Sequence, residues 1–171
     1  MGMNVGVSSH FSLIDHHGQA VADTDYRGSF MLVYFGFTHC RVVCPRALSK
    51  LSTVLDQLGA RSSLLTPLYI TVDPQRDTPE VMRSYLEANF PRFTGLCGTP
   101  QQVDAVKQSF RVFASRRPDS NEPDGYTMPH TAIAYLIGPD GEYRTHFADN
   151  LEVETIVARL NVILDQGQSD S

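Results

Sequence analysis

Two nearly unbroken apolar runs stand out along the chain, at residues 30–37 and 68–72. Both have the length of a strand, and both are rich in β-branched and aromatic residues. Because neither run alternates with polar residues, we expect two strands that are covered on both faces of a sheet. Thr38 follows the first run and Asp73 follows the second, so polar residues begin where each predicted strand stops.

The same pattern predicts two hairpins. Near the start of the chain, residues 11–15 and 20–21 flank a turn at Gly18. Later, the apolar run 131–137 is followed by a Gly-Pro-Asp-Gly turn and by residues 143–147. The polar stretch 116–125, which contains two prolines and a glycine, predicts an exposed loop ahead of the second hairpin.

Four segments carry apolar residues at helical spacing, and residues typical of helix boundaries flank them. We expect Asp77 to cap the second helix and Thr99 to cap the third. Asp149 or Asn150 is expected to cap the fourth. The helical stripes cover about residues 45–58, 79–89, 103–110 and 153–164.

The order of these elements predicts an α/β fold with a central mixed β-sheet, flanking helices and an N-terminal β-hairpin. The thioredoxin-like fold has this order. A chain of 171 residues with 42% hydrophobic residues fits one domain. The net charge of −5 and the absence of a basic block argue against nucleic acid as a partner.

Cys40 and Cys44 lie between the first predicted strand and the helix after it. Ligands gather at the carboxyl ends of strands in such sheets, and a helix N-terminus favours thiolate over thiol. A spacing of four places both residues on one helical face, roughly 5–6 Å apart at Cβ. This spacing permits either a disulfide or joint capture of a metal ion. Two thiolates and one imidazole suit copper, particularly Cu(I), whereas a structural zinc site needs four ligands.

Six histidines are candidates for a third ligand: His10, His16, His17, His39, His130 and His146. We expect His16 and His17 to be a solvated pair in a turn, His146 to be exposed, and His39 to point away from Cys40. His130 directly precedes the predicted strand at 131–137. Its position leaves open whether it is a ligand.

Two further residues have alternative interpretations. Asp73 is expected near the same sheet edge as Cys40, where it would orient Arg76 or a ligand, or serve the turn. Cys97 is a lone thiol, which more often packs as a small hydrophobic residue than acts in redox chemistry.

Three separated motifs combine these residues: Phe35-Gly-Phe-Thr-His-Cys40-x-x-x-Cys44-Pro45, Val72-Asp-Pro-x-Arg-Asp-Thr-Pro79, and His130 ahead of Tyr135-Leu-Ile-Gly-Pro-Asp-Gly141. Together they resemble the Sco/SenC family, whose members are copper chaperones for the assembly of cytochrome c oxidase. The likeness runs from about Phe11 to Leu164. It implies a thioredoxin-like fold with Cys40, Cys44 and His130 as ligands of Cu(I), Cu(II) or both, and Asp73 as a nearby supporting acid.

The resemblance also implies partners and a location. The expected acceptor is the dinuclear copper A site on subunit II of cytochrome c oxidase, which would receive copper or have its cysteines reduced. Other periplasmic copper chaperones or thioredoxin-like reductants are further expected partners of this monomer. We expect it on the periplasmic face of a bacterial inner membrane, or in the mitochondrial intermembrane space, tethered by an N-terminal anchor that precedes these residues.

Residues 11–165 are expected to form the copper-binding domain, residues 1–10 an N-terminal extension or cloning-derived segment, and residues 166–171 a flexible tail. Phe37, His39 and Pro129 are expected to contact the partner. The alternative function is a thiol–disulfide oxidoreductase that uses Cys40 and Cys44, although its usual spacing is two residues and the chain has no Trp. A peroxidase similar to peroxiredoxins fits less well, because Thr38 stands two residues before Cys40 rather than three.

Overall fold

The computed structural model describes residues 7–38, 43–114, 117–118, 120, 126–127 and 132–169. At residues 43–44, 126–127 and 167–169 it describes the backbone alone. Among all the described residues, no helix is long and apolar enough to cross a membrane.

A seven-stranded mixed sheet forms the centre of the molecule, with the strand order β2-β1-β5-β4-β3-β8-β9. Strands β3, β4 and β5 are parallel, and the pairs β3–β8, β8–β9, β1–β5 and β1–β2 are antiparallel. The strands are β1 (Ser12–Asp15), β2 (Ala20–Ala22), β3 (Phe30–Gly36), β4 (Leu65–Thr71), β5 (Thr94–Cys97), β8 (Ile133–Ile137) and β9 (Tyr143–Ala148). The mixed sheet and both predicted hairpins are confirmed.

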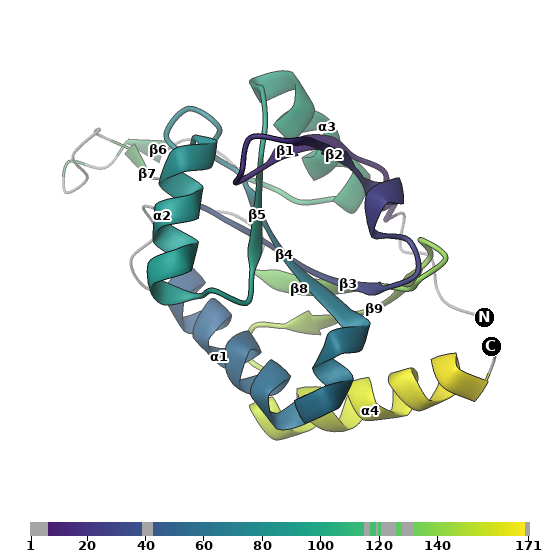
Figure 1. Cartoon of the computed structure of the whole chain (residues 1–171). Helices are drawn as coiled ribbons and strands as arrows, with labels where there is room; N and C mark the ends of the chain where they lie inside the picture. Colours follow the sequence, from purple (N-terminus) through teal and green to yellow (C-terminus); the bar gives the residue numbers. More distant parts are fainter. Residues whose placement is uncertain are drawn as a thin grey trace.

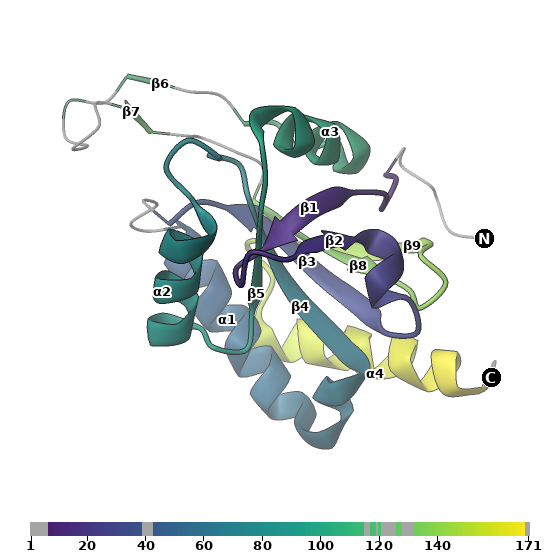
Figure 2. The same ribbon diagram turned by 45° about the horizontal axis from the view of Figure 1, so that its top comes forward.

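Helices cover both faces of this sheet, as Figures 1 and 2 show, with α1 and α4 below it and α3 above it. The helices are α1 (Val43–Leu58), α2 (Pro79–Asn89), α3 (Pro100–Phe110) and α4 (Val153–Ser169), with 3-10 turns η1 (Asp23–Tyr26) and η2 (Gly59–Leu64). Alternate residues of β3 face the two layers. Leu32 and Tyr34 pack in the core with α1, α2 and α4, whereas Val33 and Phe35 pack with α3 and the N-terminal segment. This double burial explains the unbroken apolar run.

Several element boundaries differ from the prediction. Helix α1 begins at Val43, two residues before Pro45, and α4 extends to Ser169, beyond the expected start of the tail. Inside the predicted loop, Arg117–Pro118 form β6, which pairs with β7 (Tyr126–Thr127) just after the loop as a short ribbon. The division of the chain at residues 10 and 165 stays a prediction.

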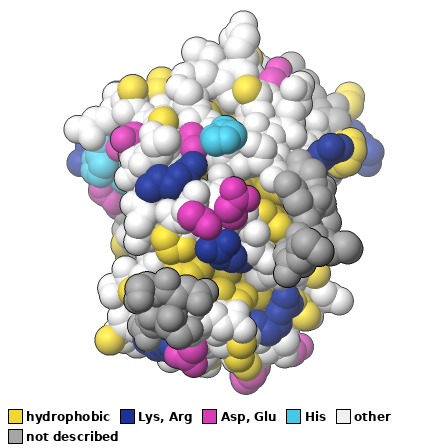
Figure 3. Space-filling model, turned by 90° about the vertical axis from the view of Figure 1, so that its right-hand side faces the viewer, with side chains coloured by type: hydrophobic (Ala, Val, Ile, Leu, Met, Phe, Trp, Pro, Cys, Tyr) yellow, Lys and Arg dark blue, Asp and Glu magenta, His cyan; other side chains and the backbone are white. Residues whose placement is uncertain are grey.

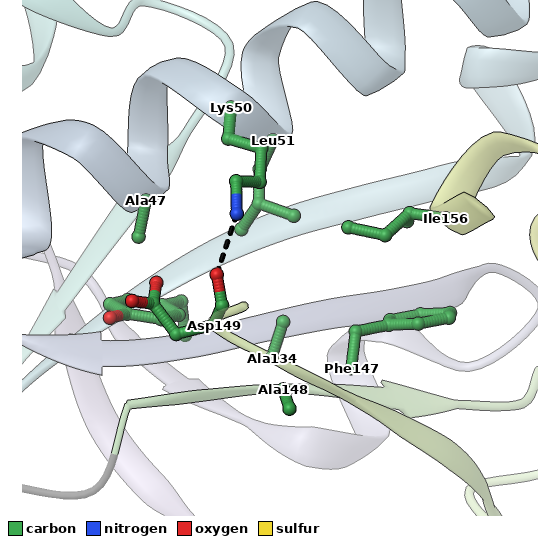
Figure 4. Close-up of a pocket in the computed structure, with 9 residues that line it drawn as sticks. Ala47, Lys50, Leu51, Ala134, Phe147, Ala148, Asp149 and Ile156 are labelled. Atoms are coloured by element: carbon green, nitrogen blue, oxygen red, sulfur yellow. Dashed lines mark hydrogen bonds between the residues drawn. The ribbon is translucent and has the colours of Figure 1, made fainter. Parts of the chain in front are cut away.

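Asp149 does not adjoin the helix it was expected to cap, because α4 begins only at Val153. Figure 4 shows instead that Lys50 of α1 reaches Asp149, beside an apolar pocket whose lining includes Phe147 and Ile156. The Lys50 Nζ donates to the Asp149 backbone oxygen at 2.6 Å and to the Leu151 oxygen at 2.9 Å. These bonds fasten α1 to the connection between β9 and α4.

Candidate metal centre at the carboxyl edge of the sheet

Strands β3, β4 and β8 bring three segments to one edge of the sheet. Gly36 at the end of β3 pairs with Thr71 at the end of β4, and the Val72 N–H donates to the Gly36 oxygen at 2.8 Å. Strand β8 is antiparallel to β3, with Tyr34 opposite Ala134, so β8 begins where β3 ends. The chain therefore leaves β3 toward Cys40, leaves β4 toward Asp73, and enters β8 from His130 at the same edge.

The predicted ligands Cys40 and His130 lie outside the described residues, as does the side chain of Cys44. The backbone of Cys44 is in the first turn of α1, at the expected strand-to-helix junction. No cluster of three His, Cys, Asp or Glu side chains that could hold a metal ion occurs within the described ranges. The ligand set therefore stays a prediction.

Thr38, two residues before Cys40, is held by the buried carboxylate of Asp77. The Thr38 N–H donates to Asp77 Oδ2 at 3.0 Å, and its hydroxyl donates to Asp77 Oδ1 at 2.6 Å. The hydroxyl of Thr71, the last residue of β4, also donates to Asp77 Oδ2, at 2.8 Å. One carboxylate thus joins the ends of both central strands.

Phe37 is held from the same side of the site. The Tyr69 hydroxyl donates to the Phe37 oxygen at 3.1 Å, and the Arg76 guanidinium lies 5.6 Å from the centre of the Phe37 ring. Arg76 is placed in turn by Asp73, whose Oδ2 accepts from Arg76 Nε at 2.5 Å, and both side chains are buried. The expectation that Asp73 orients Arg76 is confirmed. Phe37 is itself buried, which contradicts the prediction that it contacts the partner. His39 and Pro129, the other two predicted contacts, lie outside the described residues.

The electrostatics of Asp77 reflect its burial. Burial raises the pKa of Asp77, the hydrogen bonds from Thr38 and Thr71 oppose that rise, and the nearby Asp73 carboxylate adds to it. The net pKa lies above the ordinary value for an aspartate.

The prediction that Asp77 caps α2 is wrong. Thr78 is the N-cap, and its hydroxyl accepts from the Val81 N–H at 3.3 Å. In the sequence Asp-Thr-Pro, both the aspartate and the threonine are residues that cap helices. The contact between Asp77 and Thr38, 39 residues away, shows that Asp77 is engaged elsewhere. The signal available in the sequence was the placement of Thr38 directly after a buried strand. By contrast, the Thr99 cap of α3 is confirmed, and the Thr99 N–H donates in return to the Gln102 side-chain oxygen at 2.9 Å.

Among the remaining histidines, the prediction that His16 is solvated is wrong. It is buried, and its Nδ1 accepts from the Gly95 N–H at 2.9 Å, because the turn of the first hairpin folds against β5. Burial, with a contribution from His17, lowers the pKa of His16. His17 and His146 are exposed, as expected, and His10 lies against Asp23, away from the site.

Cys97 is buried in the core, which confirms that it packs as a small hydrophobic residue. Burial raises the pKa of its thiol to about 12, so the group stays protonated at neutral pH.

The fold is that of a thioredoxin-like protein in which the backbone of Cys44 lies in the first turn of the helix that follows a buried strand. Comparison with known proteins then gives the family. The family model described as SCO1/SenC matches residues 3–165, and the chain belongs to this family.

Three relatives illustrate the match. The human mitochondrial SCO1 homologue is 43% identical over 152 residues, which is 88% of this chain and 50% of that protein. The chain therefore spans about half the length of this relative. The structure of Bradyrhizobium japonicum ScoI with copper bound aligns with a TM-score of 0.82 and 38% identity, covering 91% of this chain and 98% of that one. Arabidopsis thaliana ScoI with copper bound aligns with a TM-score of 0.87 and 30% identity, covering 94% and 99%.

Proposed function

We propose that this chain is a copper-binding metallochaperone that delivers copper to the dinuclear copper A site of cytochrome c oxidase, or prepares the cysteines of that site. The observation that carries the proposal is that two family members, alike over more than nine-tenths of this chain, have been solved with copper bound. The thiol–disulfide oxidoreductase alternative has less support, because copper is present in both relatives.

The proposed ligands are Cys40, Cys44 and His130. Soft thiolates hold Cu(I), and the imidazole adds the nitrogen donor that Cu(II) prefers. The connectivity of β3, α1 and β8 supports this set, since the segments that carry the three residues enter or leave the sheet at one edge. Asp73 supports the site indirectly, through Arg76 and Phe37.

Copper titration of the reduced protein tests this proposal. We expect one Cu(I) per chain, and we expect the double variant Cys40→Ser/Cys44→Ser to lose nearly all binding. His130→Ala should weaken Cu(II) binding sharply and Cu(I) binding less, while His146→Ala, on the exposed edge of β9, should bind as the parent does. If the double cysteine variant retained the affinity of the parent, the proposal would be wrong.

The acceptor and the location form a second part of the proposal. We infer transient docking to the subunit II domain that carries the copper A site, on the periplasmic face of a bacterial membrane or in the mitochondrial intermembrane space. Transfer can be followed by mixing copper-loaded protein with the reduced, metal-free domain and recording the absorption of the assembled centre. A complex that stays intact through gel filtration without copper would contradict transient docking, because weak encounters use small interfaces.

A further inference from the structure

Asp77 is an unusual residue to find in a core. Its side chain is 1% exposed, yet within the described part of the chain it forms no ion pair with a Lys, Arg or His. Its neighbour Asp73 pairs with Arg76, whereas the donors that reach Asp77 from the described residues are all neutral: the Thr38 N–H and the hydroxyls of Thr38 and Thr71. Burial of a charge without a counter-ion is costly, so the fold gains little stability from this carboxylate.

The positions of the three donors indicate the structural role of Asp77. Two of them belong to Thr38, and the third belongs to Thr71 at the end of the neighbouring strand. The Asp77 N–H also donates to the Asp73 oxygen at 2.9 Å, which fixes the turn that presents the carboxylate. Asp77 therefore holds the backbone at Thr38 in register with β4, two residues before Cys40.

We propose that Asp77 is a positioning residue that sets the position of Cys40 relative to Cys44 at the start of α1, so that the two sulfurs can bind one metal ion together or form a disulfide. This inference deepens the proposed copper function and rests on it for the metal, but not for the disulfide. Asp77 acts through Thr38 and is not itself assigned as a ligand. Preorganisation of this kind lowers the ordering cost of binding.

Matched variants at Thr38 and Asp77 distinguish the effect of the hydrogen bonds that position Thr38 from the effect of the charge on Asp77. Thr38→Val removes the hydroxyl, and Thr38→Ser keeps it. Asp77→Ala removes both oxygens, whereas Asp77→Asn keeps the shape: its oxygen can accept from the Thr38 N–H and the Thr71 hydroxyl, while its amide donates to the Thr38 hydroxyl, which then accepts. Circular dichroism and urea unfolding identify any variant that does not fold.

Two readouts follow on the folded variants. The first is Cu(I) affinity by competition with a chromophoric chelator. The second is the midpoint potential of the Cys40–Cys44 pair in metal-free protein, equilibrated with a thiol redox buffer. If Asp77 and Thr38 had a merely structural role, their variants would show a lower urea midpoint but an unchanged Cu(I) affinity and midpoint potential, because both of these quantities are measured on the folded protein.

We expect Thr38→Val and Asp77→Ala to lower Cu(I) affinity about tenfold, the effect of one or two lost hydrogen bonds. The same loss of alignment should make the disulfide about tenfold less favourable, a rise in midpoint potential of about 30 mV. Thr38→Ser and Asp77→Asn should stay within about threefold of the parent in both. If Thr38→Val matched the parent in both readouts, or if Asp77→Asn lost as much as Asp77→Ala, the inference would be wrong. If the parent bound no copper, the proposed function would fail while the midpoint potential still tested the inference.

Discussion

Asp23 and Asp77 are both buried carboxylates that tie distant segments together, but their partners are of opposite kinds. Asp23, 5% exposed, lies in η1 (Figure 1, upper right). One of its oxygens accepts from the Phe11 N–H at 3.1 Å, and the other accepts from the Arg27 guanidinium at 2.7 Å and lies 3.1 Å from His10 Nδ1. Asp77 has only neutral donors among the described residues.

The two pKa values move apart for this reason. Burial tends to raise the pKa of Asp23, but the Phe11 N–H, His10 and Arg27 together bring it below the ordinary aspartate value. Burial raises the pKa of Asp77, and its hydrogen bonds do not reverse the shift. The charge of Asp23 is therefore favourable in the fold, and that of Asp77 is not.

The difference shows where the molecule uses charge for stability and where for placement. The contacts of Asp23 with Phe11 and Arg27 hold the N-terminal segment in place. Figure 3 shows the face of the molecule that lies on the right in Figure 1, where acidic and basic side chains border an apolar area. Asp77 lies at the edge of the sheet that carries the candidate metal centre. Functional sites often retain local features that oppose stability, and Asp77 fits that pattern.

The largest effect is expected from Asp23→Ala. It leaves the Phe11 N–H buried without its acceptor and separates Arg27 from its partner, so we expect a loss of about 2 kcal/mol in the free energy of unfolding. Urea denaturation at pH 7 measures it. Asp104→Ala is the control, because Asp104 is 65% exposed and forms a surface ion pair with Lys107 at 3.3 Å, and it should change stability by less than about 0.5 kcal/mol. A loss as small as that of the control would contradict the stabilising role of Asp23.

A smaller and opposite pair of effects is expected from the asparagine variants. Asp77→Asn keeps the hydrogen bonds and removes an unfavourable charge, so stability at pH 7 should stay equal or rise by up to about 1 kcal/mol. Asp23→Asn removes a favourable charge beside Arg27 and should lose about 1 kcal/mol. Thermal and urea unfolding of the two variants at pH 7 provide the comparison. Equal losses in both would mean that the two carboxylates do not differ in the way the contacts indicate.

The contrast between the two aspartates also marks how far sequence analysis reaches. The sheet, the hairpins and the helices follow from hydrophobic period and boundary residues, and those signals are local. The unbroken run that became β3 predicts a strand covered on both faces, and the two cores confirm it. The strand-to-helix junction that carries Cys44 was predicted for the same reason.

The roles of Asp77 and His16 could not be predicted, because each depends on a contact across the fold. Asp77 was assigned to a helix cap that Thr78 provides, and its real partner Thr38 is 39 residues away. His16 was assigned to solvent, but the turn folds onto β5 and the Gly95 N–H, 79 residues away, donates to its ring. A local sequence pattern cannot indicate contacts between residues so far apart in the chain.

The smallest effect is the pH dependence of the two asparagine variants, and its sign separates them. The folded pKa of Asp23 lies below its ordinary value of about 3.8, so its contribution to stability is fully present above that value and is lost as the pH falls through the folded pKa. The folded pKa of Asp77 is raised, so its contribution is fully present below about 3.8 and is lost as the pH rises through the folded pKa. The deficit of Asp23→Asn should therefore shrink in acid, while any advantage of Asp77→Asn should appear only as the pH rises. Urea unfolding of the parent and both variants between pH 3 and pH 7 measures these differences, which we expect to be below about 1 kcal/mol. Relative to the parent, Asp23→Asn should thus lose stability as the pH rises and Asp77→Asn should gain it; if both variants moved in the same direction relative to the parent, the two buried carboxylates would not differ in the way their contacts indicate.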